Sequence, residues 1–123
     1  MADYIINTTD DTGRPVVLYE DNWLNHVKKD HFPGHGDSAP AMIQRSVEEP
    51  HAVYESGQTA DRHVYERGHP EEVETNHNRL KWAYLRTIVH IAEEPAAIVT
   101  SFITSESYAD KGSLIRRRIE GQT

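Results

Sequence analysis

The longest apolar stretches of the chain are residues 80–92, LKWAYLRTIVHIA, and residues 96–104, AAIVTSFIT. Both are rich in β-branched and aromatic residues, and the EEP of residues 93–95 separates them. The pattern therefore predicts two long antiparallel strands, joined by a tight turn, at the centre of a sheet. Because side chains alternate between the two faces of a strand, one face of the first strand is expected to line the core. Its residues are Lys81, Ala83, Leu85, Thr87, Val89 and Ile91.

The opposite face of the same strand mixes aromatic, cationic and imidazole side chains. Its residues are Leu80, Trp82, Tyr84, Arg86, Ile88 and His90. Aromatic and guanidinium groups suit stacking on nucleic-acid bases and holding phosphate, so we predict Trp82, Tyr84 and Arg86 as substrate-binding residues. A structural interpretation stands beside this one, because large side chains also cover the second face of many small sheets simply to protect it.

The segments that precede these strands predict a hairpin, two helices and a second hairpin. YIINTT and RPVVLYE flank the turn signal DDTG, and HAVYES and DRHVYER flank GQTA. Between them, one helix is predicted from Asp21 or Asn22 to Pro33, and another from Ser38 to Pro50. Residues 67–79 have no periodic apolar pattern and are expected to form a polar loop.

The predicted fold class is α+β, with an N-terminal strand or hairpin and two helices packed on one face of an about four-stranded antiparallel sheet. One domain is expected over residues 1–104. Residues 105–123 are polar and are predicted to form a C-terminal tail that contains at most a short helix.

The composition limits the classes of function. The chain has no cysteine, which excludes disulfides, thiolate metal sites and a cysteine nucleophile. It shows neither a signal-peptide pattern nor an apolar run long enough to span a bilayer, so a cytoplasmic protein without membrane contact is expected. The net charge is −7, but it is uneven. Residues 1–60 carry ten acidic and four basic side chains, and residues 61–123 carry ten and nine, so an anion site is expected in the second half.

WLNHVKKDHF, residues 23–32, presents two imidazoles on one predicted helix. The order of VVLYEDNWLNHVKKDHFP, VEEPHAVYES, DRHVY, LRTIVHI and AAIVTSFIT resembles the phage-associated branch of the barnase, EndoU, colicin and RelE (BECR) nuclease fold. In that branch a W-x-x-H motif opens the domain and an I-V-T-S-F motif closes it. The resemblance covers residues 14–104.

The resemblance implies metal-independent, cofactor-free cleavage of RNA, with tRNA as a candidate substrate, by attack of the ribose 2′-OH on the adjacent phosphorus. It implies a toxin-like bacterial or phage-associated protein, for which a protein inhibitor is a possible partner. His26 matches the W-x-x-H histidine and Thr100 the threonine of the closing motif. The other residues proposed for catalysis are His31 and Arg62, the latter as a phosphate clamp, and Tyr65 is a further substrate-binding candidate on the face of His63.

The helix end also predicts roles for the two histidines. Pro33 stops the helix just after His31, where the C-terminal dipole favours the imidazolium and would raise the pKa of His31. On that basis His31 is expected to act as the acid and His26 as the base.

Two other classes of function remain open. A metal site built from His26, His31, His35 and Asp37 is conceivable, although the spacing does not match a known helical pair such as H-E-x-x-H. A non-catalytic interaction protein that kept the nuclease fold is the stronger alternative, because a net charge of −7 repels RNA at range and suits a basic protein partner.

Overall fold

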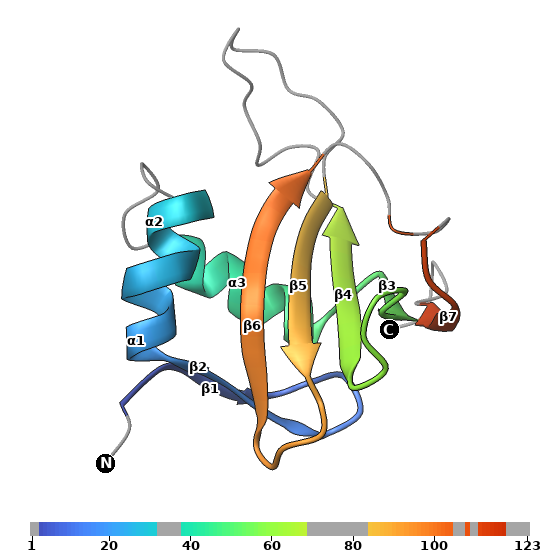
Figure 1. Ribbon diagram of the computed structural model, residues 1–123, viewed down its shortest axis with the longest axis horizontal. Coiled ribbons are helices and arrows are strands. Elements are labelled where there is room, and N and C mark those ends of the chain that lie inside the picture. The colour runs from blue at the N-terminus through green and yellow to red at the C-terminus, as the bar shows by residue number, and fades with distance from the viewer. Residues whose placement is uncertain (1–2, 32–37, 69–83, 105–107, 109–110, 118–123) are drawn as a thin grey trace, which may run out of the picture.

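The computed structural model describes residues 3–31, 38–68, 84–104, 108 and 111–117. They form a seven-stranded sheet in the order β1-β2-β6-β5-β4-β3-β7, with helix α3 behind it (Figure 1). The strands are β1 (Tyr4–Thr9), β2 (Pro15–Tyr19), β3 (Ala52–Glu55), β4 (Arg62–Gly68), β5 (Tyr84–His90), β6 (Ala96–Thr104) and β7 (Leu114–Arg117). The α+β class is confirmed.

The four strands predicted at the centre, β3 to β6, pair antiparallel with one another as expected. The sheet is nevertheless larger than the predicted four strands, and it is mixed. The N-terminal hairpin joins it because β2 pairs parallel with the first residues of β6. At the other edge β7 pairs antiparallel with β3, so residues 114–117 form a strand where a short helix was considered.

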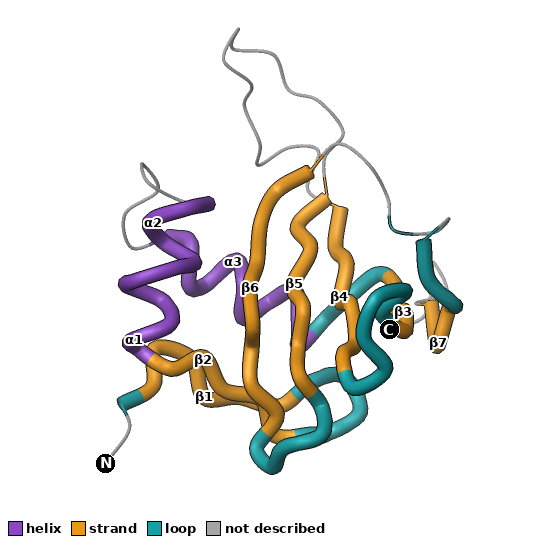
Figure 2. The backbone as a smooth tube through the Cα atoms, viewed as in Figure 1, coloured by secondary structure: helices purple, strands orange, loops and turns teal. Residues whose placement is uncertain are grey.

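The first predicted helix is one continuous helical segment (Figure 2), and its middle is a π-helical turn. It consists of α1 (Glu20–Asn22), a π-helical turn η1 (Trp23–Val27) and α2 (Lys28–His31). In η1 the Lys28 amide bonds to the Trp23 carbonyl, five residues back. Such π turns are rare and occur frequently at functional sites. The second helix, α3, spans Ser38–Glu48.

The core lies between the sheet and the two helices. Trp23 and Val27 of the first helix pack there with buried residues of α3 and the sheet. The first helix lies beside the edge of β6, whereas α3 crosses behind the strands (Figure 1). Two helices were predicted to cover one face of the sheet. The helix α3 does so, whereas the first helix lies beside the edge of β6. Among the described residues, no helix is both long and apolar enough to cross a membrane.

The alternation predicted for β5 agrees with the burial of its side chains. Leu85, Thr87 and Val89 are buried, and Thr87 contacts Ser46 of α3. Residues at the intervening positions of β5 therefore point to the face turned away from α3, which we call the open face. The candidate functional residues must be located relative to this face.

Candidate functional site

A β-bulge in β6 decides which of its residues reach the open face. Ile88 pairs with Thr100, but the next residue of β5, Val89, pairs with Ile98, so Val99 is an extra residue. An inserted residue shifts the alternation of a strand. Ile98 before the bulge and Ser101 after it are consequently both buried. Thr100 then shares the open face with Ile88, its cross-strand partner.

The open face is built of cross-strand rows. One row runs from Val64 of β4 through Ile88 to Thr100, and the next runs from Glu66 through Arg86 to Phe102. Directly opposed side chains on one face have Cβ atoms about 5 Å apart. Both rows end at β6, where the first helix begins.

The first helix is tied to β6 at this point. The Asn22 side-chain amide donates to the carbonyls of Ile98 and Val99, at 2.9 and 3.1 Å. These carbonyls flank the bulge, so the helix is fixed where the strand is irregular. One turn further, the π-helical turn carries His26 to the end of the Thr100 row.

His26 is hydrogen-bonded through both ring nitrogens. Its Nε2 lies 3.2 Å from Thr100 Oγ1, and its Nδ1 lies 3.0 Å from Asp30 Oδ2, one turn along the helix. His31 lies beside it, with the two ring centroids 5.4 Å apart, and the His31 ring is 5.5 Å from the Phe102 ring. The two imidazoles therefore stand at the ends of the Thr100 and Phe102 rows.

The pKa of His31 is shifted in the direction opposite to the one expected from the helix dipole. Burial lowers it below the ordinary 6.5, and the neighbouring His26 lowers it further, while Asp30 opposes both. Burial disfavours the charged imidazolium, and the ring contacts with His26 and Phe102 provide that burial. The expected rise in the pKa of His31, on which its prediction as the acid was based, is therefore wrong.

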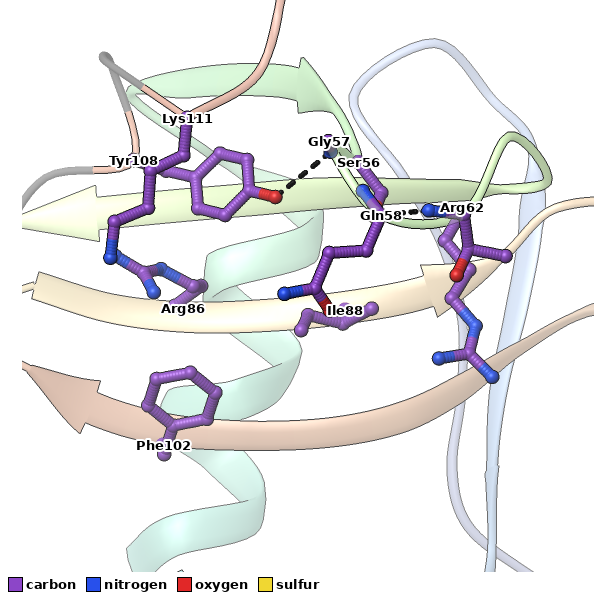
Figure 3. A pocket seen from close by; sticks show the side chains of 10 residues that line it. Ser56, Gly57, Gln58, Arg62, Arg86, Ile88, Phe102, Tyr108 and Lys111 are labelled. Atoms are coloured by element: carbon purple, nitrogen blue, oxygen red, sulfur yellow. Dashed lines mark hydrogen bonds between the residues drawn. The ribbon is translucent and has the colours of Figure 1, made fainter.

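A pocket of about 410 Å³ opens on the same face (Figure 3). Its floor contains Ile88, with Phe102 and Arg86 on the sheet and the loop of residues 56–59 facing them. The lining residues are Ser56, Gly57, Gln58, Thr59, Arg62, Arg86, Ile88, Phe102, Tyr108 and Lys111. Ile88 pairs with Thr100, and the Phe102 ring contacts the His31 ring. The pocket therefore adjoins the histidine pair, although His26, His31 and Thr100 do not line it.

Three cationic side chains line this pocket, namely Arg62, Arg86 and Lys111. The contacts of the two arginines differ. The Arg86 guanidinium carbon lies 5.3 Å from the Phe102 centroid and 4.9 Å from the Tyr108 centroid, so Arg86 is fixed between two aromatic rings. Arg62 is half-buried, and its Nε is buried without a hydrogen-bond partner among the described residues. A buried donor of this kind is costly unless a ligand or water satisfies it.

The wall of the pocket depends on a close approach of two backbone segments. A Cβ at Gly57 would lie 2.2 Å from the Lys111 carbonyl oxygen, so only glycine fits there. The Gly57 amide donates to the Tyr108 hydroxyl at 3.0 Å, and the Tyr108 amide donates to Glu66 Oε2 at 2.8 Å. The loop after β3 and the segment before β7 are thereby joined above the sheet.

Most of the residues proposed from the sequence meet on the open face. His26, His31 and Thr100 form one cluster, and Arg62 and Arg86 line the adjoining pocket. Tyr84 lies on the same face as Arg86, two residues along β5, and is half-buried. Trp82, the remaining member of the set, lies outside the described residues.

Tyr65 is the exception, and its proposed role in substrate binding is corrected. It is three residues from Arg62, an odd spacing that places it on the opposite face of β4. There it is fully buried in the core, and its hydroxyl donates to Asp10 Oδ2 at 2.5 Å. His63 lies on that same face, as predicted, so neither side chain reaches the pocket.

The metal alternative receives no support from the described residues, which contain no group of three or more His, Asp or Glu side chains able to hold an ion. His26 and His31 are close to each other. The other two proposed ligands, His35 and Asp37, lie outside the described residues, so the four-ligand site stays a prediction.

Sequence reasoning missed several residues of the site. Asp30 was detectable, because it lies four residues after His26 on a predicted helix, where side chains meet. Phe102 was detectable as well, because it lies two residues after the candidate Thr100 and so shares its face of the strand. Glu66, Tyr108 and Lys111 come together through pairing between distant segments, for which the local sequence carries no signal.

Comparison of the chain with protein-family models, curated proteins and solved structures found no match. The resemblance to the nuclease fold therefore stays a prediction, and the function must be argued from the geometry of the open face.

Proposed function

We propose that this protein is a metal-independent endoribonuclease that cleaves RNA through attack of a ribose 2′-OH on the adjacent phosphorus. The observation that carries the proposal is the cluster of His26, His31 and Thr100 on the same face as a cation-lined pocket, with Phe102 contacting His31 and lining that pocket. Two imidazoles can supply the base and the acid of this reaction, and fixed cations can hold the phosphates.

The roles of the two histidines follow from their surroundings. His31, whose pKa is lowered by burial, is neutral at pH 7 and accepts the 2′ proton. His26, beside the Asp30 carboxylate, donates a proton from Nε2 to the departing 5′ oxygen. The new bond joins the 2′ oxygen to phosphorus as the bond to the 5′ oxygen breaks. The products are a 2′,3′-cyclic phosphate and a free 5′ hydroxyl.

The other residues serve binding. Thr100 Oγ1 lies 3.2 Å from His26 Nε2, so its hydroxyl is placed to hydrogen-bond a non-bridging phosphate oxygen at the reacting centre. Ile88 and Phe102 offer an apolar surface for a base. Arg62 lies on β4, two strands away from Thr100 and two residues along from its row, which separates the two backbones by about 12 Å. Arg62 is therefore assigned to a neighbouring phosphate and not to the cleaved one.

The experiment is a cleavage assay with tRNA and total RNA in EDTA. The parent is expected to cleave, and His26→Ala and His31→Ala are each expected to lower kcat by about 10²- to 10⁴-fold, the range for loss of one acid–base group. Circular dichroism and a thermal melt establish that each variant is folded. Two variants that cleave like the parent would contradict the histidine assignment.

Binding is tested separately with Arg62→Ala. A lost charge-assisted contact is expected to weaken RNA binding by about 10-fold and to reduce the salt dependence of the affinity by about 0.7 in log–log slope. The matched control is Arg45→Ala, because Arg45 is an exposed cation on α3 paired with Glu49. Equal effects of the two variants would show that the pocket is not the binding site.

The non-catalytic interaction protein is the alternative, and the net charge of −7 is the observation in its favour. Absence of cleavage by the folded parent across a broad RNA panel is the outcome that selects it. In that case the cation-lined pocket would be assigned to an anionic group of a partner.

A further inference from the structure

Asp30 hydrogen-bonds to one of the two ring nitrogens of His26, and its carboxylate can only be the acceptor of that bond. A carboxylate at neutral pH only accepts hydrogen bonds. The 3.0 Å contact between Asp30 Oδ2 and His26 Nδ1 therefore requires a proton on Nδ1. In the neutral ring this leaves Nε2 as the acceptor, and the Thr100 hydroxyl, 3.2 Å away, is its donor.

The same arrangement fixes the orientation of the ring. His26 and Asp30 are about half exposed, with 43% and 49% of their side-chain surfaces accessible, so packing alone leaves the imidazole room to turn. Contacts at both nitrogens, one from the helix and one from β6, remove that freedom. A contact between two exposed side chains adds little stability, so its main effect is to orient the ring.

We infer that Asp30 is a positioning residue, which keeps the proton of His26 on Nδ1 and thereby makes Nε2 the atom that exchanges a proton with the substrate. This inference rests on the proposed function for its catalytic meaning. Among the residues that the structure describes, the charged and titratable groups in contact with His26 are Asp30 and His31, both from its own helix, and the group that contacts it from β6 is the neutral Thr100.

Two variants test whether position 30 must provide a hydrogen-bond acceptor or only a side chain of similar size. Asp30→Asn keeps the size of the side chain but replaces the acceptor-only carboxylate with an amide that can also donate to Nδ1, whereas Asp30→Ala removes the side chain. Asp21→Ala is the matched control, because Asp21 is an exposed acidic residue of α1, at the start of the same helix. All three replacements remove one negative charge.

The first measurement is the tautomer of His26, read from the ¹⁵N chemical shifts of its ring in histidine-labelled protein above pH 8. The parent and Asp21→Ala are expected to carry the proton on Nδ1, and both Asp30→Asn and Asp30→Ala are expected to show a population protonated on Nε2. A parent ring protonated on Nε2, or an Asp30→Ala ring indistinguishable from the parent, would overturn the inference.

The second measurement is RNA cleavage by the same proteins. Asp30→Ala is expected to lower kcat by about 10-fold with KM within about 2-fold, less than the loss of His26 itself because the ring still samples the productive orientation. Asp30→Asn is expected to lower kcat by at least as much as Asp30→Ala, because its NH2 can donate to Nδ1 and hold the other tautomer. An effect of Asp30→Ala on KM alone would contradict a positioning role.

The two proposals can fail separately. A parent that does not cleave RNA, with the tautomer of Asp30→Ala changed as described, would refute the nuclease function and leave the positioning of His26 by Asp30 established. A parent that cleaves RNA, with the tautomer unchanged in Asp30→Ala, would support the nuclease and refute the positioning role.

Discussion

Replacing Thr87 with valine tests the packing that supports the floor of the site. Thr87 is fully buried on the core face of β5. Its Oγ1 lies 2.7 Å from Ser46 Oγ on α3 and 2.9 Å from Ser101 Oγ on β6. Ser46 donates its own proton to the Ile43 carbonyl at 2.6 Å. The chain is therefore directed, with Thr87 donating to Ser46 and accepting from Ser101.

Valine keeps the shape of threonine and removes both hydrogen bonds. Each contributes about 1 kcal/mol, and the Ser101 hydroxyl is left buried without the acceptor it uses here, which adds about 1 kcal/mol more. Thr87→Val is thus expected to lower the free energy of unfolding by about 2–3 kcal/mol. For a chain of this length each kcal/mol corresponds to about 4 °C, so Tm is expected to fall by about 8–12 °C.

The assay is urea unfolding followed by circular dichroism, with a thermal melt as a second measure. Thr87→Val/Ser101→Ala is the informative partner variant, because it removes the orphaned hydroxyl. It is expected to recover about 1 kcal/mol relative to Thr87→Val alone. A loss below about 0.5 kcal/mol in Thr87→Val, or strict additivity of the two substitutions, would refute the directed chain.

Three further outcomes are expected. If His31 is the base, kcat/KM should fall only as pH drops below 6.5, because the pKa of His31 is lowered by burial and by His26; an acid limb centred at or above 6.5 contradicts this. Phe102→Ala should expose His31 and move its pKa, followed by NMR titration, upward toward 6.5. Tyr65→Phe should cost about 1–3 kcal/mol at pH 7 through the lost bond to Asp10. Burial raises the pKa of Asp10, but hydrogen bonds, led by the one from Tyr65, outweigh burial and lower it. The difference in the free energy of unfolding between Tyr65→Phe and the parent should therefore shrink as pH falls through the folded pKa of Asp10. A difference that stays constant down to about pH 2 would contradict this.

Local periodicity was sufficient to predict which residues face the core in a strand that buries one face and not the other. The alternation of residues 84–90 predicted the core residues Leu85, Thr87 and Val89 correctly. The odd spacing of Arg62 and Tyr65 likewise implies opposite faces, so the misplacement of Tyr65 was avoidable from sequence alone.

The rest depends on interactions between distant segments. The strand β2 pairs with β6, and β7 pairs with β3. Local propensity does not determine which edge of the sheet such a strand joins. The bulge at Val99 and the π-helical turn around His26 are likewise fixed by tertiary contacts. These irregular features place Thr100, Phe102 and His26 together, which is why the site was less predictable than the strands around it.

The most direct test of RNA cleavage by 2′-OH attack is to analyse the products from an oligonucleotide that the parent cuts at one position, in EDTA. The upstream product is expected to end in a 2′,3′-cyclic phosphate, and a single 2′-deoxy sugar at the cleaved position is expected to abolish the cut while neighbouring 2′-deoxy sugars do not. His26→Ala should form neither product at a comparable rate. Cleavage of the 2′-deoxy oligonucleotide, or an upstream product with a free 3′ hydroxyl, would contradict the proposed reaction.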